Sequence, residues 1–328
     1  MRQMLALALS LVLVLLPLVT PVAAQWKPEV KFLKIGVATA GGDWFRAGAK
    51  FSIMVPEVLP GVSMTTTMGG GVVNVTKVGK GEAQIAFAAS PSPEQGYQGK
   101  GDWKEPLKNI RLIASNLGLP VVIAMFVLKD SPIKTFSDIK GKRIVPGDRG
   151  WATTVLVEAI MTHAGMPPDK FKAEGGTISY TSITDRSKAL QDRNVDAIFM
   201  PASVNYPDLM VVQQALGLRA IPLPADAVDK TLAVVAGVTR STVPEGLYGG
   251  VVGKDYMSPG FLQQFIADAA LSDELVYRVT KLWWEHIKEI KDVAPVFGGA
   301  DVRIAMEHAA IPFHPGALRY YKEVGVAR

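Results

Sequence analysis

Short apolar segments of strand length alternate with helix-like segments along most of this chain, and glycine loops join them. Residues 34–38 predict a buried strand that leads directly into Gly41 and Gly42, after which apolar side chains recur at helical spacing. When a strand is followed by a loop and a helix, the helix carries the chain back along the sheet, so the next strand can pair parallel to the first. The alternation therefore predicts an α/β fold with parallel or mixed sheets.

The same unit restarts in the second half of the chain. A second glycine loop, residues 147–150, stands between a predicted strand at 143–145 and a helix that Gly165 ends. Residues 81–87 and 194–199 each follow a predicted helix and each have the pattern of a short buried strand, which is a faint internal echo. The chain has 328 residues, a length that normally makes about two domains, so we expect two α/β units.

Other segments carry more local signals. Residues 121–128 form an uninterrupted apolar run of strand length. Ser137 can cap a one-turn helix, which Gly141 ends. Residues 262–269 and 275–287 carry apolar side chains at helical spacing, so we expect the C-terminal part to be mainly helical and to serve packing rather than chemistry.

The N-terminal segment has the pattern of an export signal. Arg2 precedes an apolar run at residues 4–19, and the small residues Val22 and Ala24 match a signal-peptidase site. The run has 16 positions, fewer than the roughly 20 apolar residues of a membrane span. We expect residues 1–24 to be a signal peptide that is cleaved after Ala24, and the mature chain to be periplasmic; an uncleaved anchor is the weaker alternative.

Composition excludes several classes of function. The chain has no Cys, which removes disulfides, thiolate catalysis and iron–sulfur clusters, and its four His show no metal-ligand spacing. We therefore expect no metal and no other cofactor. The net charge of +5 is spread along the chain without a basic cluster, so we expect no nucleic-acid partner. Walker, dinucleotide-binding and Gly-x-Ser-x-Gly motifs are all missing from the sequence.

Five stretches, spread from residue 34 to residue 325, carry a family likeness. They are the strand and glycine loop that end in Gly42-Asp43-Trp44-Phe45, residues 69–71 with 81–83, residues 136–143, residues 189–199 and residues 314–323. The last of them, with the sequence HPGALRYYKE, is the most specific. Together they resemble the solute-binding proteins of the TAXI type, which serve TRAP transporters.

The resemblance implies a two-lobed periplasmic-binding-protein fold of type II, in which a hinge joins two α/β lobes and the ligand is trapped between them. Lobe 1 would comprise residues 25–122 and 240–328, lobe 2 would comprise residues 123–239, and each boundary carries a margin of about 15 residues. The implied function is that of an exported receptor, not an enzyme. It would capture a small organic anion and deliver it to the membrane subunits of a TRAP-type importer.

Two glycine loops would then face each other across the cleft. Glycine loops at helix starts present free N–H groups and the positive end of the helix dipole, which suit a carboxylate. Arg149 could pair with that carboxylate, or with Asp148 at the surface, and Trp44 and Trp151 could form apolar walls. The expected ligand-binding residues are Gly41, Gly42, Asp43, Trp44, Phe45, Gly70, Ser90, Asn116, Arg149, Gly150, Trp151, Thr153, Met200 and Ser203, with Asn205 as a further secondary candidate.

The sequence departs from the family's pattern at both loops. Trp44 and Phe45 stand where the family typically has paired Tyr, and Trp151 and Ala152 stand where it usually has Ser and Gly. Aromatic and apolar groups thus replace hydroxyl groups. We expect an organic acid with a flat or apolar body rather than a glutamate-like ligand.

Two other functions stay open at this point. An exported hydrolase could use Asp43 and Asp148 as acid and base if the two carboxyl groups faced each other. The same fold could also serve as the extracytoplasmic partner of a sensor domain instead of a transporter component.

Overall fold

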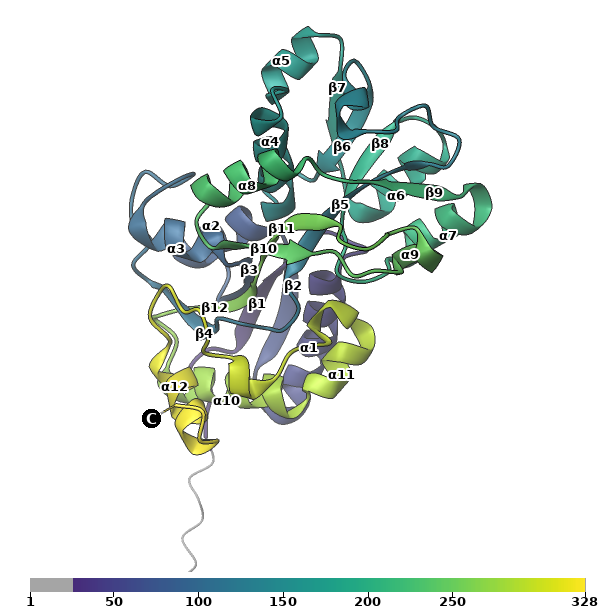
Figure 1. Cartoon of the computed structure of the whole chain (residues 1–328). Helices are drawn as coiled ribbons and strands as arrows, with labels where there is room; N and C mark the ends of the chain where they lie inside the picture. The colour runs from purple at the N-terminus through teal and green to yellow at the C-terminus, as the bar shows by residue number, and fades with distance from the viewer. Residues whose placement is uncertain (1–25, 328) are drawn as a thin grey trace, which may run out of the picture.

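Two β-sheets divide the described residues, 26–327, into two lobes in this computed structural model (Figure 1). The expected signal peptide and its cleavage site at Ala24 lie outside the described residues. Within 26–327 no helix combines the length and the apolar character that a membrane crossing requires.

The first lobe is built on a sheet with the strand order β2-β1-β3-β12-β4. Strand β1 pairs parallel with β2 and β3, whereas β12 runs antiparallel to β3 and β4. The strands are β1 (Phe32–Val37), β2 (Ser63–Met68), β3 (Ile85–Ala89), β4 (Ile110–Ala114) and β12 (Gln263–Asp268). The helices of this lobe are α1 (Asp43–Val58), α2 (Gly71–Gly79), α3 (Pro91–Gln98), α10 (Asp273–Glu285), α11 (Ile287–Val293) and α12 (Pro315–Glu323), with short 3-10 turns η2 (Pro295–Phe297) and η3 (Val302–Ile304).

The second lobe is built on a sheet with the order β10-β11-β5-β8-β6-β7, and β9 also pairs with β5. Strand β6 is parallel to β7 and β8, whereas β5 is antiparallel to β8, β9 and β11. The strands are β5 (Val121–Leu128), β6 (Arg143–Gly147), β7 (Thr177–Tyr180), β8 (Ala197–Pro201), β9 (Leu218–Ile221), β10 (Val238–Thr242) and β11 (Met257–Phe261). The helices are η1 (Phe136–Ile139), α4 (Ala152–His163), α5 (Pro168–Ala173), α6 (Ile183–Gln191), α7 (Pro207–Leu216), α8 (Ala225–Val234) and α9 (Leu247–Gly250). The expected fold class, two mixed α/β sheets with flanking helices in two lobes, is confirmed.

The chain crosses between the lobes twice, once between β4 and β5 and once at Leu262 between β11 and β12. Strands β10 and β11 lie in the second sheet, because β11 pairs with β5 through Gly260 and Val122. The boundary expected at residue 240 assigns most of β10 and all of β11 to lobe 1. No local sequence pattern tells which sheet a strand joins, so the sequence could not place these two strands. From the sheet membership we propose that lobe 2 comprises residues 121–261 and lobe 1 the remaining described residues.

Two local predictions were wrong. Apolar spacing predicted a helix at 262–269, but Gln263–Asp268 is strand β12, which lies between β3 and β4. A strand inside a covered sheet is apolar on both faces, and a short apolar run also fits helical spacing. In the second case Thr135, not Ser137, caps η1, because Asp138 completes a capping box with Thr135.

The two echo strands, β3 and β8, are buried along their whole length and lie inside their sheets. In lobe 1 an aromatic cluster packs around β3. Phe87 lies 5.2 Å from Phe265 and 5.5 Å from both Trp283 and Phe297, measured between ring centroids. Trp44 extends this cluster at 6.0 Å from Phe87. The core of lobe 1 thus fixes the start of α1.

The stretch 314–323, which carries the strongest family likeness, folds as the docked C-terminal helix α12. His314 is fully buried, and its Nδ1 accepts a hydrogen bond from the Gly316 N–H at 3.2 Å. A Cβ at Gly316 would lie 2.2 Å from the backbone oxygen of Asp273, so α12 approaches α10 closely. This part of the signature is therefore explained by packing.

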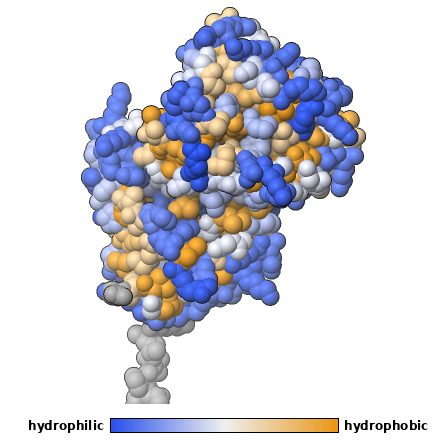
Figure 2. All heavy atoms as spheres, viewed as in Figure 1, coloured by the Kyte–Doolittle hydropathy of each residue, from blue (hydrophilic) through white to orange (hydrophobic). Residues whose placement is uncertain are grey.

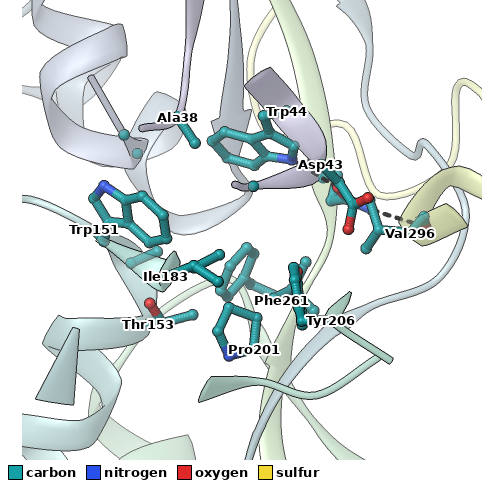
Figure 3. A pocket seen from close by; sticks show the side chains of 16 residues that line it. Ala38, Asp43, Trp44, Trp151, Thr153, Ile183, Pro201, Tyr206, Phe261 and Val296 are labelled. Atoms are coloured by element: carbon teal, nitrogen blue, oxygen red, sulfur yellow. Dashed lines mark hydrogen bonds between the residues drawn. The ribbon is translucent and has the colours of Figure 1, made fainter. Parts of the chain in front are cut away.

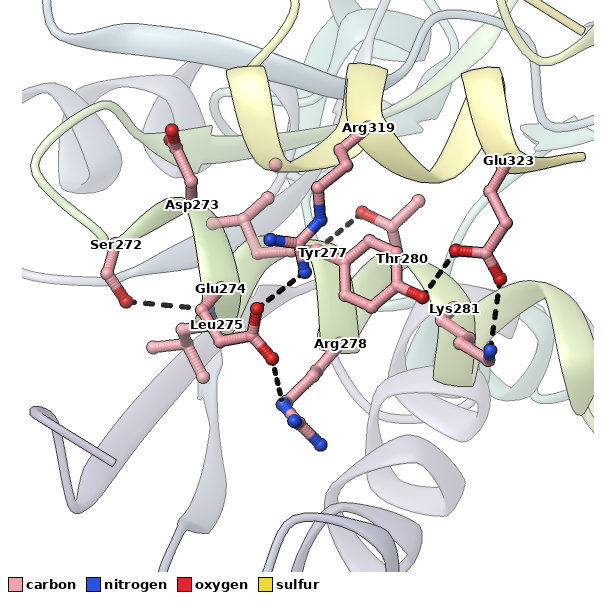
Figure 4. Close-up of polar contacts among 12 residues, drawn as sticks. Ser272, Asp273, Glu274, Leu275, Tyr277, Arg278, Thr280, Lys281, Arg319 and Glu323 are labelled. Carbon is pink, nitrogen blue, oxygen red and sulfur yellow. Dashed lines mark hydrogen bonds and ion pairs between the residues drawn. The ribbon is translucent and has the colours of Figure 1, made fainter. Parts of the chain in front are cut away.

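Ion pairs between α10 and α12 add to this packing (Figure 4). Glu274 accepts hydrogen bonds from Arg278 at 2.6 Å and from Arg319 at 2.5 Å. Glu323 accepts from Tyr277 and from Lys281 at the other end of the same contact. Elsewhere, hydrophilic residues are spread over both lobes on the face that Figure 2 shows, with smaller apolar areas between them.

Candidate ligand-binding site

A cavity of about 50 Å³ lies between the two lobes (Figure 3). Lobe 1 contributes Ala38, Gly42, Asp43, Trp44, Gly70, Gly71, Gln263 and Val296 to its wall, and lobe 2 contributes Val121, Trp151, Ala152, Thr153, Ile183, Pro201, Tyr206 and Phe261. Because both lobes line it, a molecule inside would contact both at once.

Helices from both lobes begin at the cavity wall. In lobe 1, α1 begins at Asp43 and α2 at Gly71; in lobe 2, α4 begins at Ala152 and α6 at Ile183, and Tyr206 is the N-cap residue of α7. The first N–H groups of a helix have no partner within the helix, and the helix dipole is positive at that end. The cavity wall therefore favours a negatively charged group.

The aromatic side chains of the wall present apolar faces, because their N–H groups are already bonded to protein. Trp44 Nε1 donates to the side-chain oxygen of Gln263 at 2.7 Å. Trp151 Nε1 donates to the backbone oxygen of Gly69 at 3.1 Å. With Phe261 these rings give the cavity a largely apolar interior, which suits the body of an organic ligand.

Asp43 is the acidic residue of the cavity and is only 4% exposed. Its Oδ1 accepts a hydrogen bond from Arg46 Nη2 at 2.5 Å. Burial raises the pKa of the Asp43 carboxyl above its ordinary value, and the charge of Arg46 opposes that shift. Tyr206 faces Asp43 from lobe 2 (Figure 3), and its hydroxyl, as a hydrogen-bond partner of the carboxyl group, also opposes the rise in the pKa of Asp43. Burial and the negative charge of Asp43 in turn raise the pKa of Tyr206.

Arg186 places a positive charge beside the cavity. It is fully buried and lies 5.9 Å from the ring of Trp151. Its guanidinium donates to the backbone oxygens of Phe199 at 2.6 Å and Thr181 at 3.1 Å, and its Nε has no partner in the described part of the chain. Burial lowers the pKa of Arg186 to about 10, which leaves it charged at neutral pH, and the charge of Asp148 opposes the shift.

No carboxylate within residues 26–327 forms an ion pair with Arg186 at contact distance. A buried charge that lacks a bonded counter-ion is costly, and an anion bound nearby would reduce that cost. Arg186 therefore adds to the preference for a negative ligand that the helix N-termini create.

Direct contacts between the lobes close the cavity. The Val72 N–H donates to the backbone oxygen of Gly150 at 3.2 Å, and Ser90 Oγ donates to the backbone oxygen of Gly237 at 2.5 Å. The indole of Trp151 lies on Gly70, where a Cβ would come within 2.4 Å of the ring. The cavity between these contacts, at about 50 Å³, has room for only a few water molecules, so a larger organic ligand needs more space than this arrangement of the lobes provides.

Several of the residues predicted for the site line this cavity, namely Gly42, Asp43, Trp44, Gly70, Trp151 and Thr153. Three others lie next to it. Gly41 packs against Thr184 of lobe 2, Gly150 makes the contact between lobes, and Phe45 packs against the core.

The other predicted residues lie outside the cavity wall. Ser90 and Ser203 hydrogen-bond to the two crossing segments, through Leu262 in one case and through Pro120 and Val122 in the other.

Asn116 accepts a hydrogen bond from Gly118 in a turn, and Met200 is fully buried in β8. Asn205 accepts from the Tyr248 N–H. Arg149 is exposed, and its guanidinium lies 4.2 Å from the centre of the Tyr180 ring rather than in the cavity.

Sequence reasoning missed three residues of the cavity wall, Tyr206, Gln263 and Phe261, and also Arg186 beside it. Tyr206 follows β8 directly before a helix, a position that the rule of ligands at strand ends could have found. Gln263 and Phe261 belong to strands at the second crossing, so their place depends on tertiary structure alone. Arg186 has the sequence context of an ordinary helix residue, and only its burial without an acidic partner marks it.

The pair of acids considered for hydrolysis does not meet in the cavity. Asp43 lines it, whereas Asp148 is not part of its wall and its Oδ1 accepts from the Arg149 N–H at 2.8 Å. Among residues 26–327 no group of three or more His, Asp or Glu side chains is placed to hold a metal ion.

Comparison with known proteins gives one family match and several similar structures. The model of the NMT1-like family matches residues 35–325. The fold is similar to a putative L-cystine ABC transporter from Listeria monocytogenes, with 15% identity, a TM-score of 0.48, and coverage of 83% of this chain and 98% of that one. It is also similar to the periplasmic aliphatic sulphonate binding protein SsuA from Escherichia coli, with 15% identity, a TM-score of 0.42, and coverage of 83% and 80%.

Proposed function

Because the chain belongs to the NMT1-like family and closes two lobes around a cavity, we propose that it is an extracytoplasmic solute-binding receptor for a small organic anion. The observation that carries this proposal is the meeting of several helix N-termini and the buried Arg186 at one cavity between the lobes.

The proposed mechanism is a hinge motion about the two crossing segments near residues 115–120 and 262. In the open form the cleft admits the ligand, and in the closed form the ligand contacts both lobes. A ligand that touches both lobes binds the closed form more tightly than the open form, so it shifts the equilibrium toward closure. No chemical reaction is part of this function.

The proposed ligand is a carboxylate with a flat or apolar body. The carboxylate would lie toward the helix N-termini and Arg186, and the body between the rings of Trp44 and Trp151. A glutamate-like ligand fits less well, because its second charge would meet these apolar faces without a second buried cation.

The proposed setting is a TRAP-type importer, as the sequence resemblance to TAXI-type receptors suggests. The receptor would be exported by its N-terminal segment, cleaved after Ala24, and would deliver the ligand to the membrane subunits. Co-purification of the mature chain with TRAP membrane subunits in the presence of the ligand is the expected result, and retention on subunits of another importer class instead would contradict this assignment.

A thermal-shift screen of ligand-stripped mature protein tests the binding function. A ligand present at a hundred times its Kd stabilises the fold by about 2.7 kcal/mol, which raises the melting temperature by a few degrees. We expect aromatic and branched organic acids to give this shift and glutamate to give none. Binding of neutral solutes without any acid would show that the proposed ligand class is wrong.

Two matched substitutions test the role of Arg186. Arg186→Met removes the buried charge at similar volume, and we expect acid binding to weaken at least about tenfold, as for a lost charged partner. Arg149→Met makes the same change at the exposed arginine and should leave binding unchanged. Circular dichroism and melting curves of both variants check that each one folds, and equal binding by the two variants would refute the role of Arg186.

A further inference from the structure

The helix N-termini at the cavity wall differ in the groups that they already hold. Helix α1 begins with Asp43, α6 has Asp185 in its first turn, and α7 has Asp208 there. An acidic side chain in the first turn already interacts with the positive end of the helix dipole, and it repels a second anion. In α2 the N–H of Val72 already donates to the backbone oxygen of Gly150 in lobe 2. These four helix ends are therefore less suited to bind a carboxylate.

Helix α4 begins without such a group. Its first turn holds no acidic residue, and its N-cap residue Trp151 makes no side-chain hydrogen bond to the helix. The indole N–H of Trp151 donates instead to the backbone oxygen of Gly69. Asp148, the acid that precedes α4, is not part of the cavity wall, and its Oδ1 accepts from the Arg149 N–H. The first N–H groups of this twelve-residue helix thus lack both a partner within the helix and a capping side chain.

The hydroxyl of Thr153, in the first turn of α4, points to a ligand independently of the helix dipole. Thr153 is on the cavity wall and only 4% exposed, and its Oγ1 has no hydrogen-bond partner among residues 26–327. Buried threonines inside other helices of this chain are satisfied, since Thr231 donates to the backbone oxygen of Ala227 and Thr280 to that of Val276. A buried hydroxyl without a partner is costly, so a bound group at this point would relieve that cost.

We propose that the ligand's carboxylate binds at the start of α4, where Thr153 donates a hydrogen bond to it. This inference rests on the proposed function, because it concerns the ligand of the same cavity. Arg186, which lies 5.9 Å from the ring of Trp151, adds its positive charge on the same side. Thr153 and Arg186 both belong to lobe 2, so lobe 2 alone carries the anion-binding groups and lobe 1 closes over the body of the ligand with Trp44.

Substitutions of Thr153 test the role of its hydroxyl. Thr153→Val removes the hydroxyl at nearly the same volume, and Thr153→Ser keeps it. The probes are 3-phenylpropanoate and 4-methylpentanoate, one aromatic and one branched acid, measured by titration calorimetry. We expect Thr153→Val to bind at least one of them about tenfold more weakly than the wild type, as for a lost hydrogen bond to a charged group, and Thr153→Ser to stay within about threefold. Thr162→Val, at an exposed threonine of the same helix, should bind like the wild type.

A matched pair at Ala152 tests the helix end itself. Ala152→Asp places an acid in the first turn of α4, as the other helices have, and Ala152→Asn adds a side chain of the same size without the charge. An acid in the first turn favours the helix, so the Asp variant should fold at least as well as the Asn variant. We expect Ala152→Asp to bind the same acid at least about tenfold more weakly than Ala152→Asn does.

The outcomes separate this inference from the proposed function. If the wild-type protein binds an acid and Thr153→Val binds it as well as Thr162→Val does, or if the two Ala152 variants bind it equally, the inference is overturned while the receptor function stands. If the wild-type protein binds neither probe and no acid in the wider screen, the proposed function fails and the inference fails with it. Because the two sets of variants are independent, one set still tests the inference when a variant of the other does not fold.

Discussion

Replacing Gly70 by Ala should open the lobes. The backbone of Gly70 is nearly extended, with φ 160° and ψ −174°, so the change acts mainly through the added methyl group. That Cβ would lie 2.4 Å from Cδ1 and 2.8 Å from Nε1 of Trp151, whereas ordinary contacts are 3.4 Å or longer. The indole must therefore move by about an ångström, and we expect lobe 2 to move with it because Trp151 is the N-cap residue of helix α4.

The size of the effect follows from the contacts that this movement breaks. The bond from Trp151 Nε1 to Gly69 and the bond from the Val72 N–H to Gly150 both join the lobes beside Gly70. Each is worth about 0.5–1.5 kcal/mol net, so the closed form should lose about 1–3 kcal/mol relative to the open form. That corresponds to about a 5- to 150-fold change in the closed-to-open ratio and a matching loss of ligand affinity.

Small-angle scattering of ligand-free protein measures this change. We expect Gly70→Ala to give a larger radius of gyration than the wild type, whereas Gly253→Ala, where a Cβ meets nothing within 4 Å, should scatter like the wild type. Adding Trp151→Leu to Gly70→Ala should relieve the clash and restore part of the compaction. Identical scattering and affinity of Gly70→Ala and wild type would refute the reasoning that the Trp151 contact closes the lobes.

Three further predictions concern the packing of lobe 1. Trp283→Ala, at a fully buried ring, should lower the free energy of unfolding by about 3–5 kcal/mol in urea titrations, whereas Phe32→Ala, at a ring that is 77% exposed, should change it by less than about 0.5 kcal/mol. Burial lowers the pKa of His314, so the unfolded chain binds a proton at this residue more readily than the folded chain does. The melting temperature should therefore fall as the pH drops below 6.5, the ordinary pKa of histidine, and His314→Asn should lose part of this pH dependence. Arg319 holds the pKa of the Glu274 carboxyl below its usual range, so Glu274→Gln should cost about 0.2–1 kcal/mol at neutral pH in melting experiments, and an undiminished cost in 1 M salt would contradict an ion-pair origin.

The sequence alone determined the fold class, because the spacing of apolar residues and the placement of glycines are local signals. Each strand that leads into a glycine loop and a helix, such as residues 34–42, must belong to an α/β sheet whatever its neighbours are. The same signals located the starts of α1, α2 and α4, which line the cavity with Gly42, Gly70 and Trp151.

Only the tertiary structure decided which sheet each late strand joins and which side chains meet. Strand β12 was mistaken for a helix because its apolar pattern fits both periods, and its true form depends on β3 and β4 on either side. Arg149 stands in a glycine loop and was the arginine expected to bind the ligand, whereas Arg186 stands in a predicted helix, yet Arg149 is exposed against Tyr180 and Arg186 is fully buried beside the cavity. Burial is a property of the whole packed chain, so the charge that favours an anion could not be identified until distant segments were placed together.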